Sequence, residues 1–161
     1  MKKYRHLLIW LNLAVLLWLF NRSVFEKENV LNTGKLVLLE IFPVDSTADA
    51  QRDFIKLNYQ QLDAMPADSL PQKGFCMVRT DERGRVDSLH FQEAMQPRQE
   101  HELAIKYLVK NGSVAIGAGT YYFQKGNAAN FNRAKYAGLK VNEAGDAVLF
   151  ALYDGQLVQL Q

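Results

Sequence analysis

The chain has 161 residues, which suffices for a membrane anchor and one small domain but not for two full domains. Beyond the first 20 residues, 16 basic side chains accompany 17 acidic ones, with no run of Lys and Arg. This balance argues against a nucleic-acid partner, because phosphate binding needs clustered cations. The single cysteine, Cys76, excludes an intramolecular disulfide, and its apolar neighbours predict a buried thiol.

The N-terminal segment predicts a transmembrane helix. Residues 7–20 are apolar except for Asn12, and residues 4–25 give close to the roughly 20 residues that a bilayer requires. The apolar run does not end in small residues, which favours an uncleaved signal anchor over a cleavable signal peptide.

The flanking charges predict the orientation of this anchor. Three basic residues precede the span, against Arg22 and Lys27 after it, so the positive-inside rule places the N-terminus in the cytoplasm. We therefore expect a cytoplasmic flank and anchor over residues 1–25, a connector over 26–34 and an exported domain over 35–161. The expected location is the inner (plasma) membrane, with the C-terminal domain periplasmic or extracytoplasmic.

The exported domain begins with a nearly continuous apolar segment, residues 36–42, which predicts a strand buried on both faces. Pro43 to Ser46 form a predicted turn in which Asp45 bonds the backbone ahead of it. Residues 52–60 alternate with period two, which predicts a half-buried strand. Its core-facing residues would be Asp53, Ile55, Leu57 and Tyr59, with Phe54, Lys56 and Asn58 on the other face.

Glycine-containing turns then divide the chain into hairpins. A polar loop over 61–72 precedes strands at 74–80 and 86–92, which flank a turn containing Gly84. Alternating apolar residues at 103–109 lead to a type I′ turn at Asn111-Gly112, and residues 114–123 return. Within this return, Gly117-Ala118-Gly119 predicts a bulge rather than a nucleotide-binding turn.

The C-terminal part predicts a short helix over 128–136 and a last hairpin, with strands at 139–141 and 147–153 around a turn at 143–146. The predicted fold class is therefore mainly β (α+β), with an N-terminal transmembrane helix. An antiparallel β-sheet or barrel-like domain with one short helix follows it.

Two motifs resemble those of one protein family. The segment from Arg52 to Tyr59 resembles the motif that names the GDYXXLXY family, with Asp53, Leu57 and Tyr59 matching, while Arg52 replaces glycine and Phe54 replaces tyrosine. A second family segment is similar to an aromatic strand at 121–123 followed by matches at Ala134, Tyr136, Leu139, Val141, Gly145, Ala147 and Leu149. The resemblance implies a bacterial inner-membrane anchor with an exported domain, often encoded near multi-pass membrane proteins, and no established activity.

The candidate motif or binding residues are Asp45, Asp53, Phe54, Leu57, Tyr59 and Tyr136. A carboxylate at Asp53 would be costly on an apolar face unless it is paired, so it either locks the neighbouring turn or contacts a ligand or partner. No catalytic residue, metal site or cofactor is predicted, because the histidines are isolated and no nucleophile is placed.

Three functions fit this pattern. The first is a non-enzymatic accessory protein that binds a multi-pass membrane partner or an envelope component. The second is an envelope hydrolase, related to signal-peptidase-like proteases, that uses Asp53 with a nearby lysine, such as Lys106, or a nearby tyrosine. The third is a small-molecule binding domain, which requires an apolar cavity.

Overall fold

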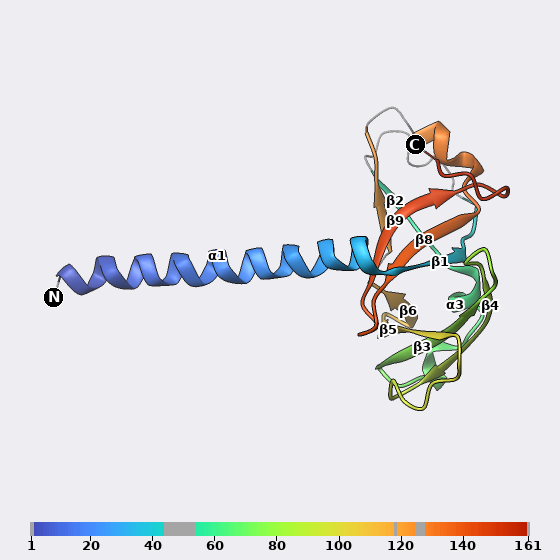
Figure 1. Cartoon of the computed structure of the whole chain (residues 1–161), viewed down its shortest axis with the longest axis horizontal. Coiled ribbons are helices and arrows are strands. Elements are labelled where there is room, and N and C mark those ends of the chain that lie inside the picture. The colour runs from blue at the N-terminus through green and yellow to red at the C-terminus, as the bar shows by residue number, and fades with distance from the viewer. Residues whose placement is uncertain (1, 44–53, 118, 125–127, 161) are drawn as a thin grey trace.

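The computed structural model describes residues 2–43, 54–117, 119–124 and 128–160. A long N-terminal helix, α1 (Lys2–Thr33), leads into a β-rich domain that contains all the strands. The helix projects from one side of this domain, so that the N-terminus lies far from every strand (Figure 1).

Helix α1 contains neither glycine nor proline and ends directly before Gly34. Within the described residues it is the one helix long and apolar enough to span a membrane, over Leu8–Thr33. Residues 26–33, predicted as part of a connector, are the last two turns or so of this same helix. In the described chain, Gly34 alone therefore separates helix α1 from the first strand of the domain.

The strands form three antiparallel sheets. The first has the order β1 (Lys35–Glu40), β8 (Tyr136–Val141) and β9 (Ala147–Tyr153). The second pairs β2 (Phe54–Lys56) with β7 (Thr120–Tyr122), and the third has the order β4 (Val86–Gln92), β3 (Lys73–Thr80), β5 (Glu102–Lys110) and β6 (Ser113–Ile116). Three short helices complete the described elements: α3 (Gln60–Asp63), η1 (Ala67–Ser69) and η2 (Ala128–Arg133).

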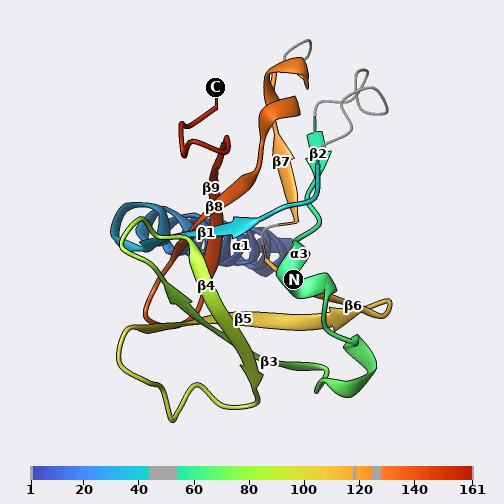
Figure 2. The same cartoon turned by 90° about the vertical axis from the view of Figure 1, so that its right-hand side faces the viewer.

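Backbone hydrogen bonds join the first and third sheets at two places in this half-barrel-like fold. The amide of Leu38 on β1 donates to the carbonyl of Gly84 at 2.7 Å, which links the first sheet to the β3–β4 turn. The amide of Lys106 on β5 donates to Gly145 in the β8–β9 turn at 2.8 Å. Looking along α1, the β2–β7 pair lies on one side of the three-stranded sheet, and strands β3, β4 and β5 lie on the other (Figure 2). The predicted class, mainly β with an N-terminal helix and a barrel-like domain, is confirmed.

The main core takes side chains from all three sheets, and a smaller cluster covers the outer face of the first sheet. Strand β1 serves both, because Val37 and Leu39 face the main core while Leu38 packs with Ala151 and Tyr153 outside. This confirms the strand buried on both faces.

The predicted hairpin turns are also confirmed. Asn111 and Gly112 both have positive φ angles, 51° and 74°, as a type I′ turn requires. Gly84 and Gly145 adopt the same left-handed region with φ angles of 82° and 84°. Cys76 is buried in β3, as predicted.

Four predicted elements differ from the structure. Of the strand predicted for 52–60, the structure describes β2 (Phe54–Lys56), and helix α3 already begins at Gln60. Ile55, Leu57 and Tyr59 nevertheless face the core, as expected. The return strand predicted for 114–123 is two strands, because β6 ends at Ile116 and β7 pairs in another sheet.

The helix predicted for 128–136 ends at Arg133, because the backbone of Tyr136 pairs with Glu40 on β1 and Tyr153 on β9. Pairing with distant strands thus overrides the local helical pattern. The loop predicted for 61–72 contains the rest of α3 and the single turn of η1.

Candidate membrane-proximal site

The C-terminal end of α1, which we call its foot, packs against the first sheet. Val30 is the one α1 side chain that is buried among those described, with 3% of its surface exposed, and α1 contacts β8 and β9. The amide of Gly34 donates to the carbonyl of Val30 at 2.9 Å. A Cβ atom on Gly34 would lie 2.4 Å from that oxygen and 3.0 Å from the amide nitrogen of Val141. Only glycine therefore allows the chain to leave the helix this close to β8.

A groove of about 1180 Å³ lies beside this junction. Its walls come from four parts of the chain that are distant in sequence: Asn29 and Thr33 on α1, the β3–β4 turn, residues 96–101 before β5, and the β8–β9 turn. Because α1 itself forms one wall, the groove lies on the side of the domain from which the anchor emerges.

The groove carries an excess of negative charge. Five carboxylates line it, accompanied by the cations Lys35 and Arg98 and by His101. Asp81 already has partners: it accepts hydrogen bonds from the backbone amides of Arg83 and Arg85 at 2.9 Å and from the Arg85 guanidinium at 2.7 Å. The Arg85 guanidinium is the main reason that the pKa of Asp81 is lowered from its usual value.

Glu102 is the buried carboxylate of the groove, with 7% of its surface exposed. Its Oε2 atom accepts a hydrogen bond from the Gln99 amide at 2.9 Å, and its Oε1 atom lies 3.8 Å from Nδ1 of His90. Gln99 in turn accepts a hydrogen bond from Arg79 at 3.0 Å. These contacts hold the segment before β5 against the sheet and so shape one wall.

The remaining carboxylates, Glu82, Glu100 and Glu143, are exposed on three different walls of the groove. Three separate loops thus present negative charge toward one concave surface. Such an arrangement suits a cationic segment of another protein better than an anionic lipid headgroup.

The predicted motif residues do not line this groove. Leu57 and Tyr59 belong to the main core, where burial raises the pKa of the Tyr59 phenol. Phe54 is half-buried, with its ring 6.0 Å from that of the exposed Tyr122. Tyr136 packs on the smaller outer cluster, so it is separated from Tyr59 by strand β1. Asp45 and Asp53 lie outside the described residues.

The hydrolase hypothesis gains nothing from the described residues. Its proposed base, Lys106, forms an ion pair with Asp146 at 2.7 Å. In the described part of the chain, no group of three or more His, Cys, Asp or Glu side chains could hold a metal ion.

The groove is not predicted from the sequence, because its walls meet only when the three sheets close around the core. One local signal does exist: Glu102 opens an otherwise apolar alternating strand, and an acid at such a position needs a partner in the folded chain.

Comparison with curated proteins and with solved structures finds no match for this chain. A family model described as GDYXXLXY protein matches residues 16–152, from within the anchor to the last strand. Since this match covers most of the chain, the protein belongs to the GDYXXLXY family.

Proposed function

We propose that this protein is a membrane-anchored accessory protein whose extracytoplasmic domain binds a multi-pass membrane protein beside its own anchor. In this proposal the N-terminus is cytoplasmic, the membrane is the bacterial inner membrane, and the anchor is not cleaved. The partner contributes a positively charged loop or helix end to the acidic groove at the foot of α1.

The observation that carries the proposal is the rigid junction between α1 and the first sheet. From Phe25 to Thr33 the helix rises about 12 Å at about 1.5 Å per residue. The headgroup layer beyond the hydrocarbon core is roughly 5–8 Å thick on each side. An anchor ending near Phe25 would therefore hold the groove just outside the headgroups, within reach of a neighbouring protein's membrane-proximal loops.

Helix α1 supports the same placement through its side chains. The Arg22 guanidinium lies 5.8 Å above the Trp18 ring and pairs with Glu26 at 3.0 Å. Tryptophan and arginine favour the interface between hydrocarbon and headgroups. This series of residues would mark the outer boundary of the span about two to three turns before the domain begins.

Site-specific photocrosslinking in intact membranes tests the proposal. A photoreactive residue at Glu100 or Glu143, on two walls of the groove, is expected to give a crosslink to a multi-pass membrane protein. The same residue at the exposed Asp68, which does not line the groove, is the matched control. Crosslinks to an envelope component instead would replace the partner, and absence of any groove-specific crosslink would contradict the proposal.

A second variant tests the role of the junction. A flexible Gly-Ser insertion between Thr33 and Gly34 breaks the Val30 to Gly34 hydrogen bond but leaves the anchor and the domain sequence intact. We expect the groove-specific crosslink to fall sharply while membrane fractionation is unchanged. An undiminished crosslink would show that the fixed geometry is not needed.

A further inference from the structure

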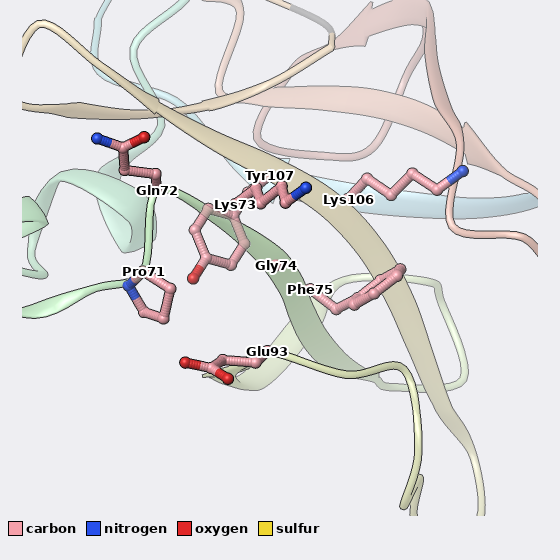
Figure 3. Close-up of a pocket in the computed structure, with 8 residues that line it drawn as sticks. All are labelled: Pro71, Gln72, Lys73, Gly74, Phe75, Glu93, Lys106 and Tyr107. Atoms are coloured by element: carbon pink, nitrogen blue, oxygen red, sulfur yellow. The ribbon is translucent and has the colours of Figure 1, made fainter.

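A second concave site lies away from the groove, where β3 begins beside the middle of β5. It has a volume of about 670 Å³ and shares no lining residue with the membrane-proximal groove. Pro71, Phe75 and the ring of Tyr107 give it a mainly apolar surface (Figure 3). Its volume is in the range of small-molecule sites.

The hydroxyl group of Tyr107 is the unusual feature of this pocket. Tyr107 is 4% exposed, and its buried hydroxyl has no hydrogen-bond partner among the described residues. Buried polar groups are almost always bonded, because an unbonded group loses its water without compensation. The hydroxyl is therefore available to a ligand that enters the pocket.

Glycine at position 74 leaves room beside this hydroxyl. A Cβ atom there would lie 3.0 Å from the Tyr107 hydroxyl and 2.6 Å from the Gln92 carbonyl oxygen. Every larger residue would cover the phenol. Tyr107 itself is held in place by Phe91, whose ring meets it edge to face with centroids 5.0 Å apart.

Glu93 provides a second polar group on the same side of the pocket. Its carboxylate and the Tyr107 hydroxyl both lie near Pro71, whereas the amino groups of Lys73 and Lys106 point away (Figure 3). Burial is the main reason that the pKa of Tyr107 is raised, and the charges of Cys76 and Glu93 raise it further.

The charges around the pocket balance. Lys106 is neutralised by Asp146, at 2.7 Å, and the formal charges of the two other ionisable lining residues, Lys73 and Glu93, are opposite. A balanced site gives no net attraction to an anion or a cation, so it favours a neutral ligand. A group that accepts from the phenol and donates to the carboxylate satisfies both polar positions, and a hydroxyl group does both.

We propose that this pocket binds a neutral, mainly apolar small molecule through one hydroxyl group, which hydrogen-bonds Tyr107 and Glu93 while the apolar body packs on Pro71 and Phe75. This site is independent of the partner-binding groove. The protein would thus combine a partner surface at the membrane with a separate site for an apolar alcohol.

Four probes with one phenylbutyl body test this chemistry: phenylbutanol, butylbenzene, phenylbutanoate and phenylbutylammonium. Each is titrated against the full chain in lipid nanodiscs, and the amide NMR signals of Gly74 and Phe75 report binding at the pocket. We expect phenylbutanol to bind with a Kd about tenfold lower than that of butylbenzene, the worth of one or two hydrogen bonds. Both charged probes should bind more weakly than the alcohol.

Two variants assign the hydrogen bonds. Tyr107→Phe should reduce the advantage of the alcohol over butylbenzene at least threefold without weakening butylbenzene itself. Glu93→Leu, at an exposed position, should raise the Kd of phenylbutanol at least threefold with little effect on folding. Tyr122→Phe is the matched control, because Tyr122 is 74% exposed and lies outside the pocket.

Three results would overturn the proposal. They are no shift at Gly74 and Phe75 with any probe, equal affinity for alcohol and hydrocarbon in the unmodified protein, and an advantage of the alcohol that Tyr107→Phe leaves undiminished. Because the groove crosslinks do not involve this pocket, they should be unaffected by either variant, so failure here is distinguishable from failure of the partner proposal.

Discussion

Lys106 on β5 and Asp146 in the β8–β9 turn, 40 residues apart in sequence, form an ion pair with 2.7 Å between Nζ and Oδ1. Next to it, the Lys106 amide donates to the carbonyl of Gly145. The pair and the backbone bond together attach the four-stranded sheet to the three-stranded one. Part of the closure of the half-barrel therefore depends on a contact between two half-exposed side chains.

Asp146→Asn should lower the free energy of unfolding by no more than about 1 kcal/mol at neutral pH, because both partners are about half exposed. Lys106 is the main cause of the lowered pKa of Asp146. The contribution of the pair is thus present above the unfolded-state pKa of the carboxyl and is lost as pH falls through its lower folded-state pKa. Urea unfolding at neutral and acid pH measures this, with the exposed Asp87→Asn as control; an equal loss at both pH values would contradict it.

Val30→Ala should destabilise the attachment of α1 to the domain. Val30 is 3% exposed, and removing two buried methyl groups costs about 1.5–3 kcal/mol. Val24→Ala, on the exposed part of the same helix, is the control, since Val24 is 40% exposed. Limited proteolysis near residue 34, followed in nanodiscs, should accelerate for Val30→Ala only; equal rates would contradict the docked junction.

Gly34→Ala should be more damaging than its size suggests. The added Cβ would meet the Val30 carbonyl at 2.4 Å and the Val141 amide at 3.0 Å, both of them backbone atoms that cannot move alone. We expect a loss of about 2 kcal/mol or more, as for overpacking of a core. Gly119→Ala provides the matched control, because no atom lies within 4 Å of its added Cβ. Thermal unfolding midpoints that fall equally for both variants would contradict the close packing of Gly34 against β8.

The Cys76 thiol should resist alkylation in the native protein. It is 1% exposed, and burial raises its pKa from 9.0 to about 12. Iodoacetamide at pH 8 should label it only after denaturation, because the thiolate is the nucleophile. The raised pKa also means that its contribution to stability is full below the unfolded-state pKa and is lost as pH rises toward the folded-state value. Rapid labelling of the native chain would contradict this burial.

A reporter fused after Gln161 should be active only if the domain is exported. An alkaline phosphatase fusion, which needs an oxidising compartment, is expected to be active, and a cytoplasm-dependent fluorescent fusion to be dark. Replacing Lys2, Lys3 and Arg5 by Gln should weaken this orientation, because the positive-inside bias is modest. An active cytoplasmic reporter with the unmodified chain would overturn the topology.

Local signals predict the local elements well. The turn at Asn111-Gly112 is specified by residues that tolerate positive φ, and the burial of Ile55, Leu57 and Tyr59 by period-two alternation. These features depend on neighbours in sequence. The same holds for β1, whose nearly continuous apolar run anticipates burial on both faces.

Features that depend on distant neighbours are not predicted. Strands β6 and β7 follow each other in the chain but lie in different sheets, because β7 pairs with β2, about 65 residues earlier in the sequence. No local sequence pattern marks this change of sheet. The position of the unpaired Tyr107 hydroxyl likewise depends on Gly74 and Phe91, which two other strands contribute. Both candidate sites therefore appear only when the sheets are assembled.

The buried Val30 side chain and the hydrogen bond from Gly34 to Val30 attach the end of α1 to the first sheet. Membrane helices tilt by about 20° on average, and the angle responds to bilayer thickness and to neighbouring helices. In the proposed membrane arrangement, α1 passes into β1 through Gly34 alone and packs on β8 and β9. A change in the tilt of α1 would then turn the domain with it and change the direction that the acidic groove faces.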